Sequence, residues 1–335
     1  MEYYNNTTTH NNHSNGTSNT SDHYKATLKW ISFVIFLGII AFNTLVIVLL
    51  LSRKKKTRMG FFVTNLAIAD LCLGLFFVLP ELVFSHFGVP WNKYVCYIVY
   101  AYFSQFAVYV SIYAIVVLSI DRLYVIVRPL SAASKGQKYR FGLVSAAWII
   151  GALLAIQYVV HIKTWKTSCF HIFPYREAII YIDTSIVIIV PVIIIVICYT
   201  GIIITICRRE KRGFIPANRS ETASTEEIIS KNKVISSAKI KTIKLLLVVV
   251  CVYILCWTPI FVDAFLQFYG NIGTGLIYKV LYTFAPLNSF ANPLVFLIFN
   301  FKMFRSKKKK TDSHLLHMNT MKTSLGSKRH IKSSI

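Results

Sequence analysis

The chain has 335 residues, of which 55% are hydrophobic and only 15% charged, and its mean hydropathy is +0.55. Soluble domains of this length carry more charge, so the composition excludes an ordinary soluble protein and places the chain in a lipid bilayer. The formal net charge of +24 would suit a nucleic-acid-binding protein, but the cations flank apolar segments and form no separate basic domain, which argues against that function.

Seven apolar segments are each long enough to cross about 30 Å of hydrocarbon at about 1.5 Å per residue. They cover residues 30–52, 60–84, 94–121, 140–160, 178–207, 241–269 and 275–299. The sequence therefore predicts an all-α membrane protein with a bundle of seven transmembrane helices over residues 30–299. A short amphipathic eighth helix is expected at 300–310 and a cytoplasmic tail at 311–335.

An odd number of spans places the two termini on opposite sides of the membrane, and the loop charges indicate the orientation. Seven of the 37 lysines and arginines fall on the amino-terminal side, which leaves 30 on the other side. Because cytoplasmic loops carry an excess of cations, the amino terminus of this multi-pass plasma-membrane protein is expected to be extracellular. Residues 1–29 are expected to be a disordered, glycosylated tail, since they contain Asn-x-Ser/Thr sequons at Asn5, Asn6, Asn12, Asn15 and Asn19.

The cations on the inner side are expected to lie against anionic lipid headgroups, where each contributes about 1 kcal/mol. Residues 307–310, four consecutive lysines, are the densest example. The alternative is that these cations serve only to set the topology.

Two of the seven cysteines are placed to form a disulfide. The other five fall in or at the ends of spans, where cysteine behaves as a small hydrophobe. Cys96 lies at the outer end of the third span and Cys169 in the long second outer loop, both on the oxidising side of the membrane. One bridge that ties this loop to the bundle is therefore expected, with two buried free thiols as the alternative.

Polar residues in the middle of several spans lie at matching depths. Asp70 is ten residues beyond Gly60, about 15 Å into the membrane, and Ser111 is eleven residues before Arg122, about 16 Å. A lone carboxylate at this depth needs partners, so a shared pocket is expected, with a small hard cation or water among its oxygens. Hydrogen bonding between helices without an ion is the alternative. The pocket members are Asp70, Ser111, Asn288, Ser289 and Asn292.

Marker residues occur in order along the seven segments. They are Asn43, residues 66–70, Cys96, Asp121, Arg122, Trp148, Pro191, Tyr199, residues 256–259 and residues 292–296. Over about residues 30–305 this set resembles the class A, rhodopsin-like G protein-coupled receptors. The resemblance implies a receptor that catalyses nucleotide exchange on a heterotrimeric G protein through an outward swing of its sixth helix, and that is not itself an enzyme.

The resemblance also implies roles for individual residues. The shared polar pocket looks like the family's site for an allosteric sodium ion, with Asp70 as the charged ligand, and no other cofactor is expected. Trp257 looks like the family's toggle residue. The switch that faces the G protein is expected to comprise Asp121, Arg122, Tyr199 and Phe296.

Departures from the family pattern concern this switch. Leu123 and Phe296 each stand where the family usually has tyrosine, and Lys239 lies near the place where many relatives carry an acid that locks Arg122 from the sixth helix. Because a cation cannot form that lock, Arg122 is expected to rely on Asp121. Raised basal signalling would follow.

Within the class, residues 53–70 and 285–293 resemble peptide receptors, in the group of crustacean cardioactive peptide and neuropeptide S receptors beside the vasopressin and oxytocin receptors. Residues 263–270 indicate the same group. The expected partners are an extracellular peptide, a heterotrimeric G protein and membrane lipids, and nucleic acid is not among them.

Acidic side chains near the outer ends of the spans favour a cationic ligand. Converging carboxylates at Glu81, Asp183 and Asp263 would bind an arginine side chain or an amino terminus through charge-assisted hydrogen bonds. The alternative for each acid is that it faces lipid headgroups or pairs with a nearby cation such as His86, Lys166 or Arg176. The expected ligand-binding residues are Glu81, Ser104, Gln105, Asp183, Trp257, Asp263 and Gln267.

Three other functions compete with a peptide receptor. A biogenic-amine receptor is the runner-up, although Ser104 and Gln105 occupy the part of the third span where that group carries aspartate. A light receptor needs a lysine deep in the seventh span to bind retinal, and Lys279 lies near the outer end. A transporter belongs to a different class, but the sequence shows no inverted repeat, and it lacks the metalloprotease and serine-hydrolase motifs that would suggest catalysis.

Overall fold

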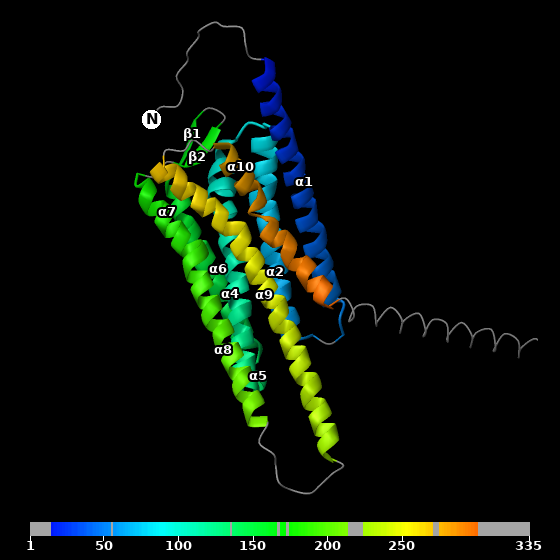
Figure 1. The fold of residues 1–335 in the computed structure, drawn as a ribbon. Helices are drawn as coiled ribbons and strands as arrows, with labels where there is room; N and C mark the ends of the chain where they lie inside the picture. Colours follow the sequence, from blue (N-terminus) through cyan, green and yellow to red (C-terminus); the bar gives the residue numbers. More distant parts are fainter. Residues whose placement is uncertain are drawn as a thin grey trace, which may run out of the picture. The chain divides into compact units, whose positions relative to one another are not determined.

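A computed structural model describes residues 15–54, 56–134, 136–165, 168–171, 174–213, 224–270 and 275–300 (Figure 1). Within these ranges seven helices are long and apolar enough to cross a membrane, which confirms the expected seven spans. They cover Lys25–Leu51, Arg58–His86, Lys93–Val127, Gln137–Val160, Glu177–Arg209, Leu247–Tyr269 and Lys279–Asn300. Apart from Asn300, the expected eighth helix and the tail at 311–335 lie outside the described residues.

The first helix, α1 (Asn15–Leu51), begins well before residue 30. The expectation of an unstructured tail is therefore corrected for residues 15–29. Part of this extension packs: Leu28 is buried, and the Lys29 ammonium lies 3.7 Å from the centre of the Phe87 ring. The sequons at Asn15 and Asn19 fall inside α1, and those at Asn5, Asn6 and Asn12 lie outside the described residues.

The second and third spans are built from several helical segments. The second consists of α2 (Arg58–Leu73), η1 (Gly74–Val78) and η2 (Glu81–His86), and the third of α3 (Lys93–Val95), η3 (Cys96–Phe103) and α4 (Ser104–Val127). Side chains cap two of these starts, because the Thr57 hydroxyl accepts a bond from Gly60 N and the Asn92 side chain accepts one from Tyr94 N.

The remaining elements follow in chain order. They are α5 (Pro129–Ser134), α6 (Gln137–Val160), β1 (Ile162–Trp165), β2 (Ser168–His171), α7 (Arg176–Thr184), η4 (Ser185–Ile189), α8 (Val190–Gly213), α9 (Ser224–Gly270), α10 (Gly275–Phe284) and a last helical stretch over 287–300. In the described part of the chain the strands form one antiparallel hairpin, in which Thr164 pairs with Cys169.

Prolines accompany departures from regular α-helix. Because proline lacks the backbone N–H, the hydrogen-bond ladder cannot continue unchanged through it. The π-helical segments η1 and η2 flank Pro80, and η4 ends two residues before Pro191. A turn at residues 285–286 separates α10 from the last helical stretch. Pro259 lies inside α9 without ending it.

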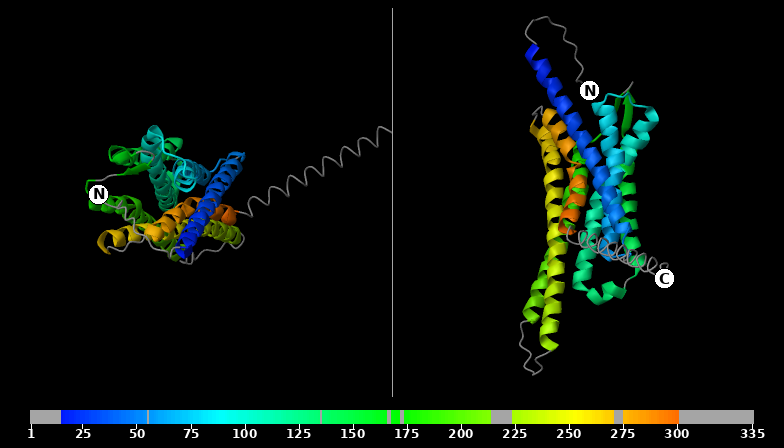
Figure 2. Two further views of the ribbon diagram at one scale, coloured as in Figure 1. Left: turned by 90° about the horizontal axis from the view of Figure 1, so that it is seen from above. Right: turned by 90° about the vertical axis from the view of Figure 1, so that its right-hand side faces the viewer.

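The chain divides into two compact units. The first contains Met1–Ala217 and Val250–Phe290, and the second Asn218–Val249 and Ala291–Ile335. In the first unit α4 is the central element, since it packs against α2, α6 and α8 (Figure 2). Most of its residues are buried. In the second unit, the Asn300 side chain donates to the Phe296 carbonyl at 2.8 Å.

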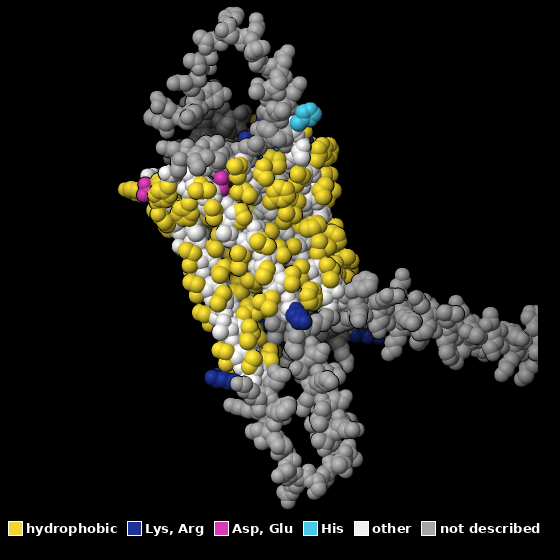
Figure 3. All heavy atoms as spheres, in the orientation of Figure 1, with side chains coloured by type: hydrophobic (Ala, Val, Ile, Leu, Met, Phe, Trp, Pro, Cys, Tyr) yellow, Lys and Arg dark blue, Asp and Glu magenta, His cyan; other side chains and the backbone are white. Residues whose placement is uncertain are grey.

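The outer surface of the helices is apolar, as expected for contact with lipid. Val34, Ile149 and Leu153 are among many large hydrophobic side chains that are exposed. On the face drawn in Figure 3, hydrophobic side chains cover most of the described surface and charged side chains are few. Polar groups are instead collected inside the first unit, where they form the sites described next.

Candidate functional site

The mid-membrane polar cluster lies where the second, third and seventh spans meet. The Ser111 hydroxyl donates to Asp70 Oδ1 at 2.6 Å and lies 3.3 Å from the Ser289 hydroxyl. All three residues have no exposed surface. The structure thus brings together three of the five residues expected in this pocket, although their positions in the sequence are up to 219 residues apart.

Two buried amides border the same cluster. Asn43 donates to the carbonyls of Ile39 at 2.9 Å and Ser289 at 3.1 Å, which ties α1 to the seventh span. Asn288 is 1% exposed, and within the described residues neither its Nδ2 nor its Oδ1 has a hydrogen-bond partner. Buried amides are normally bonded, so Asn288 has capacity for a water or an ion. Asn292, the fifth expected member, belongs to the second unit.

The donor set of this cluster suits a hard monovalent cation. It offers one carboxylate, two hydroxyls and the Asn288 carbonyl oxygen, and hard cations are bound by oxygen. In the described part of the chain, groups of three or more histidine, cysteine or acidic side chains that could hold a metal ion are not found. The cluster therefore fits sodium better than a transition metal.

A second buried carboxylate, Asp121, lies near the carboxyl-terminal end of the third span between two arginines. Arg122 Nη2 contacts Asp121 Oδ2 at 2.8 Å, as expected from the sequence. Arg58 donates through Nε to Asp121 Oδ1 at 2.7 Å, and its Nη2 lies 2.6 Å from the same oxygen. Each carboxylate oxygen is therefore held by a different arginine.

Arg58 was not among the expected site residues, yet it joins three elements. Its Nη1 donates to the carbonyl of Ala132 in α5 at 2.7 Å, and its guanidinium lies 5.8 Å from the ring centre of Tyr124 and 5.5 Å from that of Tyr139. In the sequence Arg58 looked like one more topology-setting cation. The contact with Asp121 spans 63 positions, which no local pattern reveals.

The other expected switch residues are placed as follows. Tyr199 is buried on α8, and Gly201 on the same helix faces Leu123 so closely that an added Cβ would lie 2.9 Å from Leu123 Cδ1. Leu123, which stands where the family usually has tyrosine, thus packs against the fifth span. Phe296 belongs to the second unit.

A cavity of about 420 Å³ lies between the third, fifth, sixth and seventh spans in the first unit. Its lining includes four expected ligand-binding residues: Gln105, Asp183, Trp257 and Gln267. Asp183 accepts hydrogen bonds from the hydroxyls of Tyr158 at 2.6 Å and Tyr109 at 3.3 Å. These two tyrosines, which sequence reasoning missed, orient the carboxylate without neutralising its charge.

Trp257 lines this cavity from the sixth span. Its side chain is buried, and its indole N–H has no hydrogen-bond partner among the described residues. Behind it, the Tyr253 hydroxyl donates to the Val187 carbonyl, which joins the sixth and fifth spans. A ligand that enters the cavity therefore reaches a residue on the proline-containing helix α9.

The three expected acids do not converge on one cavity. Glu81 lines a second cavity of about 690 Å³, together with Lys25, His86 and Lys279. The two cavities share Tyr100, Gln267 and Tyr282 in their walls. Asp263 is buried and accepts a bond from Gln267 Nε2 at 2.6 Å, so it positions a residue of the shared wall. Ser104 is buried, and the described linings of both cavities omit it.

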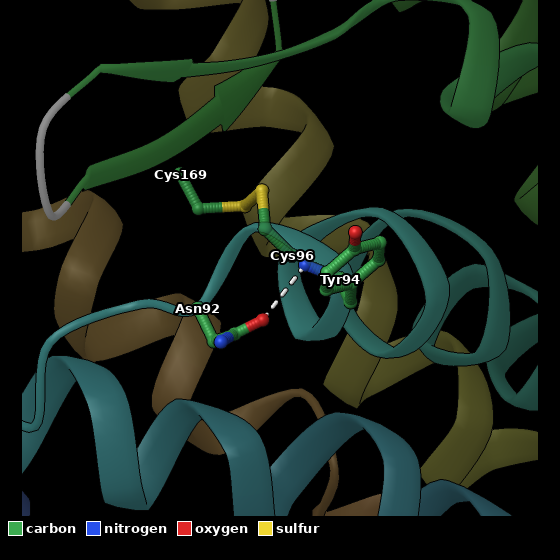
Figure 4. Close-up of a disulfide and its surroundings, with 4 residues drawn as sticks. All are labelled: Asn92, Tyr94, Cys96 and Cys169. Atoms are coloured by element: carbon green, nitrogen blue, oxygen red, sulfur yellow. Dashed lines mark hydrogen bonds between the residues drawn. A yellow bond between two sulfur atoms is a disulfide. The ribbon is translucent and has the colours of Figure 1, made fainter.

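The expected disulfide is present, between Cys96 and Cys169, whose Cα atoms lie 5.8 Å apart (Figure 4). It connects the β2 strand of the hairpin to the start of the third span. Cys96, Ala101 and Ile162 form a small buried cluster around it, against which Trp91 and Tyr100 pack. Because Tyr100 also lines both cavities, the bridge fixes the hairpin beside their walls.

Comparison with known families agrees with this architecture. Residues 42–296 match the model of the 7 transmembrane receptor (rhodopsin family). The chain therefore belongs to the rhodopsin family of seven-transmembrane receptors, which are receptors and not enzymes, and it is a multi-pass plasma-membrane protein.

Several curated receptors are similar over most of their length. The neuropeptide S receptor of Rattus norvegicus is 30% identical over 291 residues, covering 80% of this chain and 75% of the relative. The mesotocin receptor of Rhinella marina is 28% identical, covering 84% and 75%, and the vasopressin V1b receptor of Mus musculus is 26% identical, covering 76% and 67%.

Proposed function

We propose that the protein is a cell-surface receptor for an extracellular peptide that carries a positive charge, and that it promotes nucleotide exchange on a heterotrimeric G protein. The observation that carries this proposal is that Asp183 and Trp257 line the same cavity. Relatives named for neuropeptide S, mesotocin and vasopressin support a ligand of the same class.

The charge of Asp183 favours a cationic group. Its two tyrosine partners are neutral donors, so they supply no positive charge to balance an ionised carboxylate. An arginine side chain or a peptide amino terminus would form a charge-assisted hydrogen bond with it. Trp257 and Phe261 supply apolar and aromatic surface beside this contact.

The size and arrangement of the cavities favour a peptide over a monoamine. The cavity with Asp183 adjoins the one with Glu81 through three shared wall residues, and together they offer space for an extended ligand with several side chains. The second cavity contains Lys25 and Lys279 as well as Glu81, so it suits a polar or mixed-charge part of the same ligand. The cationic residue of the peptide would occupy the first cavity.

Binding at Trp257 would reach the inner side through the sixth helix. Outward motion of the cytoplasmic part of α9, which precedes Pro259 in the chain, would open a surface for the G protein, and Arg122 would leave Asp121 to contact it. A sodium ion held by Asp70, Ser111, Asn288 and Ser289 would stabilise the resting arrangement, because it adds a positive charge to a pocket that activation rearranges. Nucleotide exchange itself takes place on the G protein.

The proposed orientation has the amino terminus outside, with glycosylation of its sequons, and the loop cations on the cytoplasmic side. A direct test of the function expresses the receptor in cells with calcium and cyclic AMP reporters and applies a panel of cationic neuropeptides and a panel of monoamines. A response to one or more peptides is expected. Full activation by a monoamine alone, or uptake of a substrate without any G-protein response, would contradict the proposal.

A further inference from the structure

The two adjoining cavities proposed for the peptide have opposite charge. The cavity of about 690 Å³ is lined by two lysines, Lys25 from α1 and Lys279 from α10, and Glu81 from η2 is the single acid in its described lining. With histidine counted as neutral, these groups leave one net positive charge. The cavity of about 420 Å³ has Asp183 in its described lining and no lysine or arginine, so its net charge is negative.

A third lysine adds positive charge beside the first of these cavities. Lys29 lies one helical turn after Lys25 on α1, and it is near enough to His86 to act on it electrostatically. Lys279 acts in the same way on both Glu81 and His86. Three of the seven cations on the amino-terminal side of the membrane therefore gather around one cavity.

Glu81 is the residue that would attract a ligand cation here, but the protein already supplies partners for it. Its carboxylate has Lys279 nearby and the Ser85 hydroxyl as a hydrogen-bond partner. A second cation from the ligand would be repelled by the lysines of the same wall. A carboxylate would instead form charge-assisted hydrogen bonds with them.

Packing holds the lysine-bearing part of α1 against the second span. Leu28 is buried, and the Ser32 hydroxyl lies 3.2 Å from His86 Nε2. These contacts lie within two turns of Lys25 along the same helix. They explain how a residue ahead of the most hydrophobic part of α1 comes to line a cavity between the spans.

The wall shared by the two cavities allows one ligand to reach both. Gln267, Tyr100 and Tyr282 line each of them. Asp263 holds Gln267 in this position, because it accepts a hydrogen bond from Nε2 at 2.6 Å. An extended peptide that passes these side chains can place one charged group in each cavity.

We propose that the cavity of Lys25 and Lys279 binds a carboxylate of the same peptide whose cationic group occupies the cavity of Asp183. The carboxylate belongs to an aspartate, a glutamate or a free carboxyl terminus, which share this chemistry. The ligand therefore carries both charges, and a peptide that is only cationic binds more weakly. This inference rests on the proposed function for the identity of the ligand, whereas the positive charge of the cavity does not.

The first test measures that charge without agonist or G protein, so its failure is distinct from a failure of the proposed function. Ser85 is exposed and lines the cavity, and Ser85→Cys places a thiol there. Purified full-length receptor is labelled with a methanethiosulfonate that carries either a sulfonate or a trimethylammonium group. Mass spectrometry of the fragment that contains residue 85 gives both rates, each divided by the rate with free 2-mercaptoethanol. The anionic reagent is expected to be favoured.

Variants in this background assign the charge to particular residues. Lys25→Gln with Lys279→Gln should lower the ratio of anionic to cationic labelling about tenfold, because both lysines attract one reagent and repel the other. Lys93→Gln with Lys163→Gln is the matched control, since it removes the same charge from outside both described linings and should change the ratio little. Glu81→Gln should raise the ratio, which a general loss of structure would not do.

The second test uses the peptide found in the reporter screen and identifies the carboxylate. One version has an amidated carboxyl terminus, and the others have one acidic side chain each replaced by its amide. The version that lacks the bound carboxylate should lose about tenfold in affinity for the wild-type receptor. It should lose less than twofold for the receptor with Lys25→Gln and Lys279→Gln, because that receptor already lacks the contact.

Three results would overturn the inference. Preference for the cationic reagent at Ser85→Cys, or equal changes of the labelling ratio in the two double-lysine variants, would show that these lysines do not make the cavity positive. Full affinity of a peptide in which every carboxylate is an amide would exclude a bound carboxylate, even if that peptide activates the receptor.

Discussion

Asp121 and Asp183 are two enclosed carboxylates whose partners differ in charge. Asp121 has no exposed surface and is held by two cations, Arg58 and Arg122. Asp183 borders a cavity, and the partners described for it are the neutral hydroxyls of Tyr109 and Tyr158. A carboxylate neutralised within the protein can act as a lock, whereas one oriented by neutral donors keeps its charge for a ligand.

The largest effect is expected from Arg122→Ala at the first of these acids. Agonist-driven nucleotide exchange should be abolished, because Arg122 is the group proposed to leave Asp121 for the G protein. The fold should survive, since Asp121 keeps its pair with Arg58. Nucleotide exchange on purified G protein and surface staining measure the two properties separately. Normal exchange would remove Arg122 from the switch.

At the second acid, Asp183→Asn should weaken a cationic peptide by about 30- to 5,000-fold, or 2–5 kcal/mol, because a ligand cation would lose its buried partner. Competition binding of the peptide found in the reporter screen checks this value. Tyr158→Phe is the matched control: it removes one oriented donor but leaves the charge, so its effect should be much smaller. Equal peptide affinity in wild type and Asp183→Asn would refute the contact.

The variant Arg58→Gln tests how the two arginines share Asp121. Because the two arginines share one carboxylate, removing Arg58 leaves Asp121 to Arg122 alone and should hold Arg122 more firmly. Basal signalling is expected to fall about fivefold, which corresponds to about 1 kcal/mol in the resting equilibrium. Arg128→Gln is a control for loss of an exposed cation. Increased basal signalling would instead make Arg58 part of the lock.

Asp70 is intermediate between these two acids, since its described donor is the neutral Ser111 hydroxyl and its pocket has unused amide groups. If sodium binds beside this carboxylate, Asp70→Asn should remove the dependence of agonist affinity on sodium, a shift of roughly two- to tenfold or about 0.4–1.4 kcal/mol. Agonist binding in sodium chloride and in choline chloride measures it. A persistent sodium effect would leave hydrogen bonding between helices as the role of the pocket.

The sequence predicts the spans and the mid-membrane cluster well, for physical reasons. Hydrocarbon thickness fixes the length of each span, so hydropathy locates all seven. The constant rise of a helix converts residue count into depth, which placed Asp70, Ser111 and Ser289 together. The disulfide followed from the few cysteines on the oxidising side.

Hydropathy and residue counting cannot predict how each helix is rotated about its own axis. Residue counting gives similar depths for three acids, Glu81, Asp183 and Asp263. They nevertheless face different surroundings, because packing sets the rotation of each span about its axis. Arg58 meets Asp121 for the same reason. The early start of α1 was also hidden, because residues 15–29 lack an apolar pattern that would predict a helix.

The extension of α1 has a practical meaning for work with this receptor. Lys25 and Leu28 form part of the wall around Glu81, so a segment that precedes the most hydrophobic part of the first span belongs to the cavity proposed for the ligand. Chimeras that exchange residues 15–29 between related receptors are thus expected to alter which ligands are accepted while most of the first span stays unchanged. Expression tags are best joined before residue 15, and deletions that reach residue 30 would open this cavity on one side.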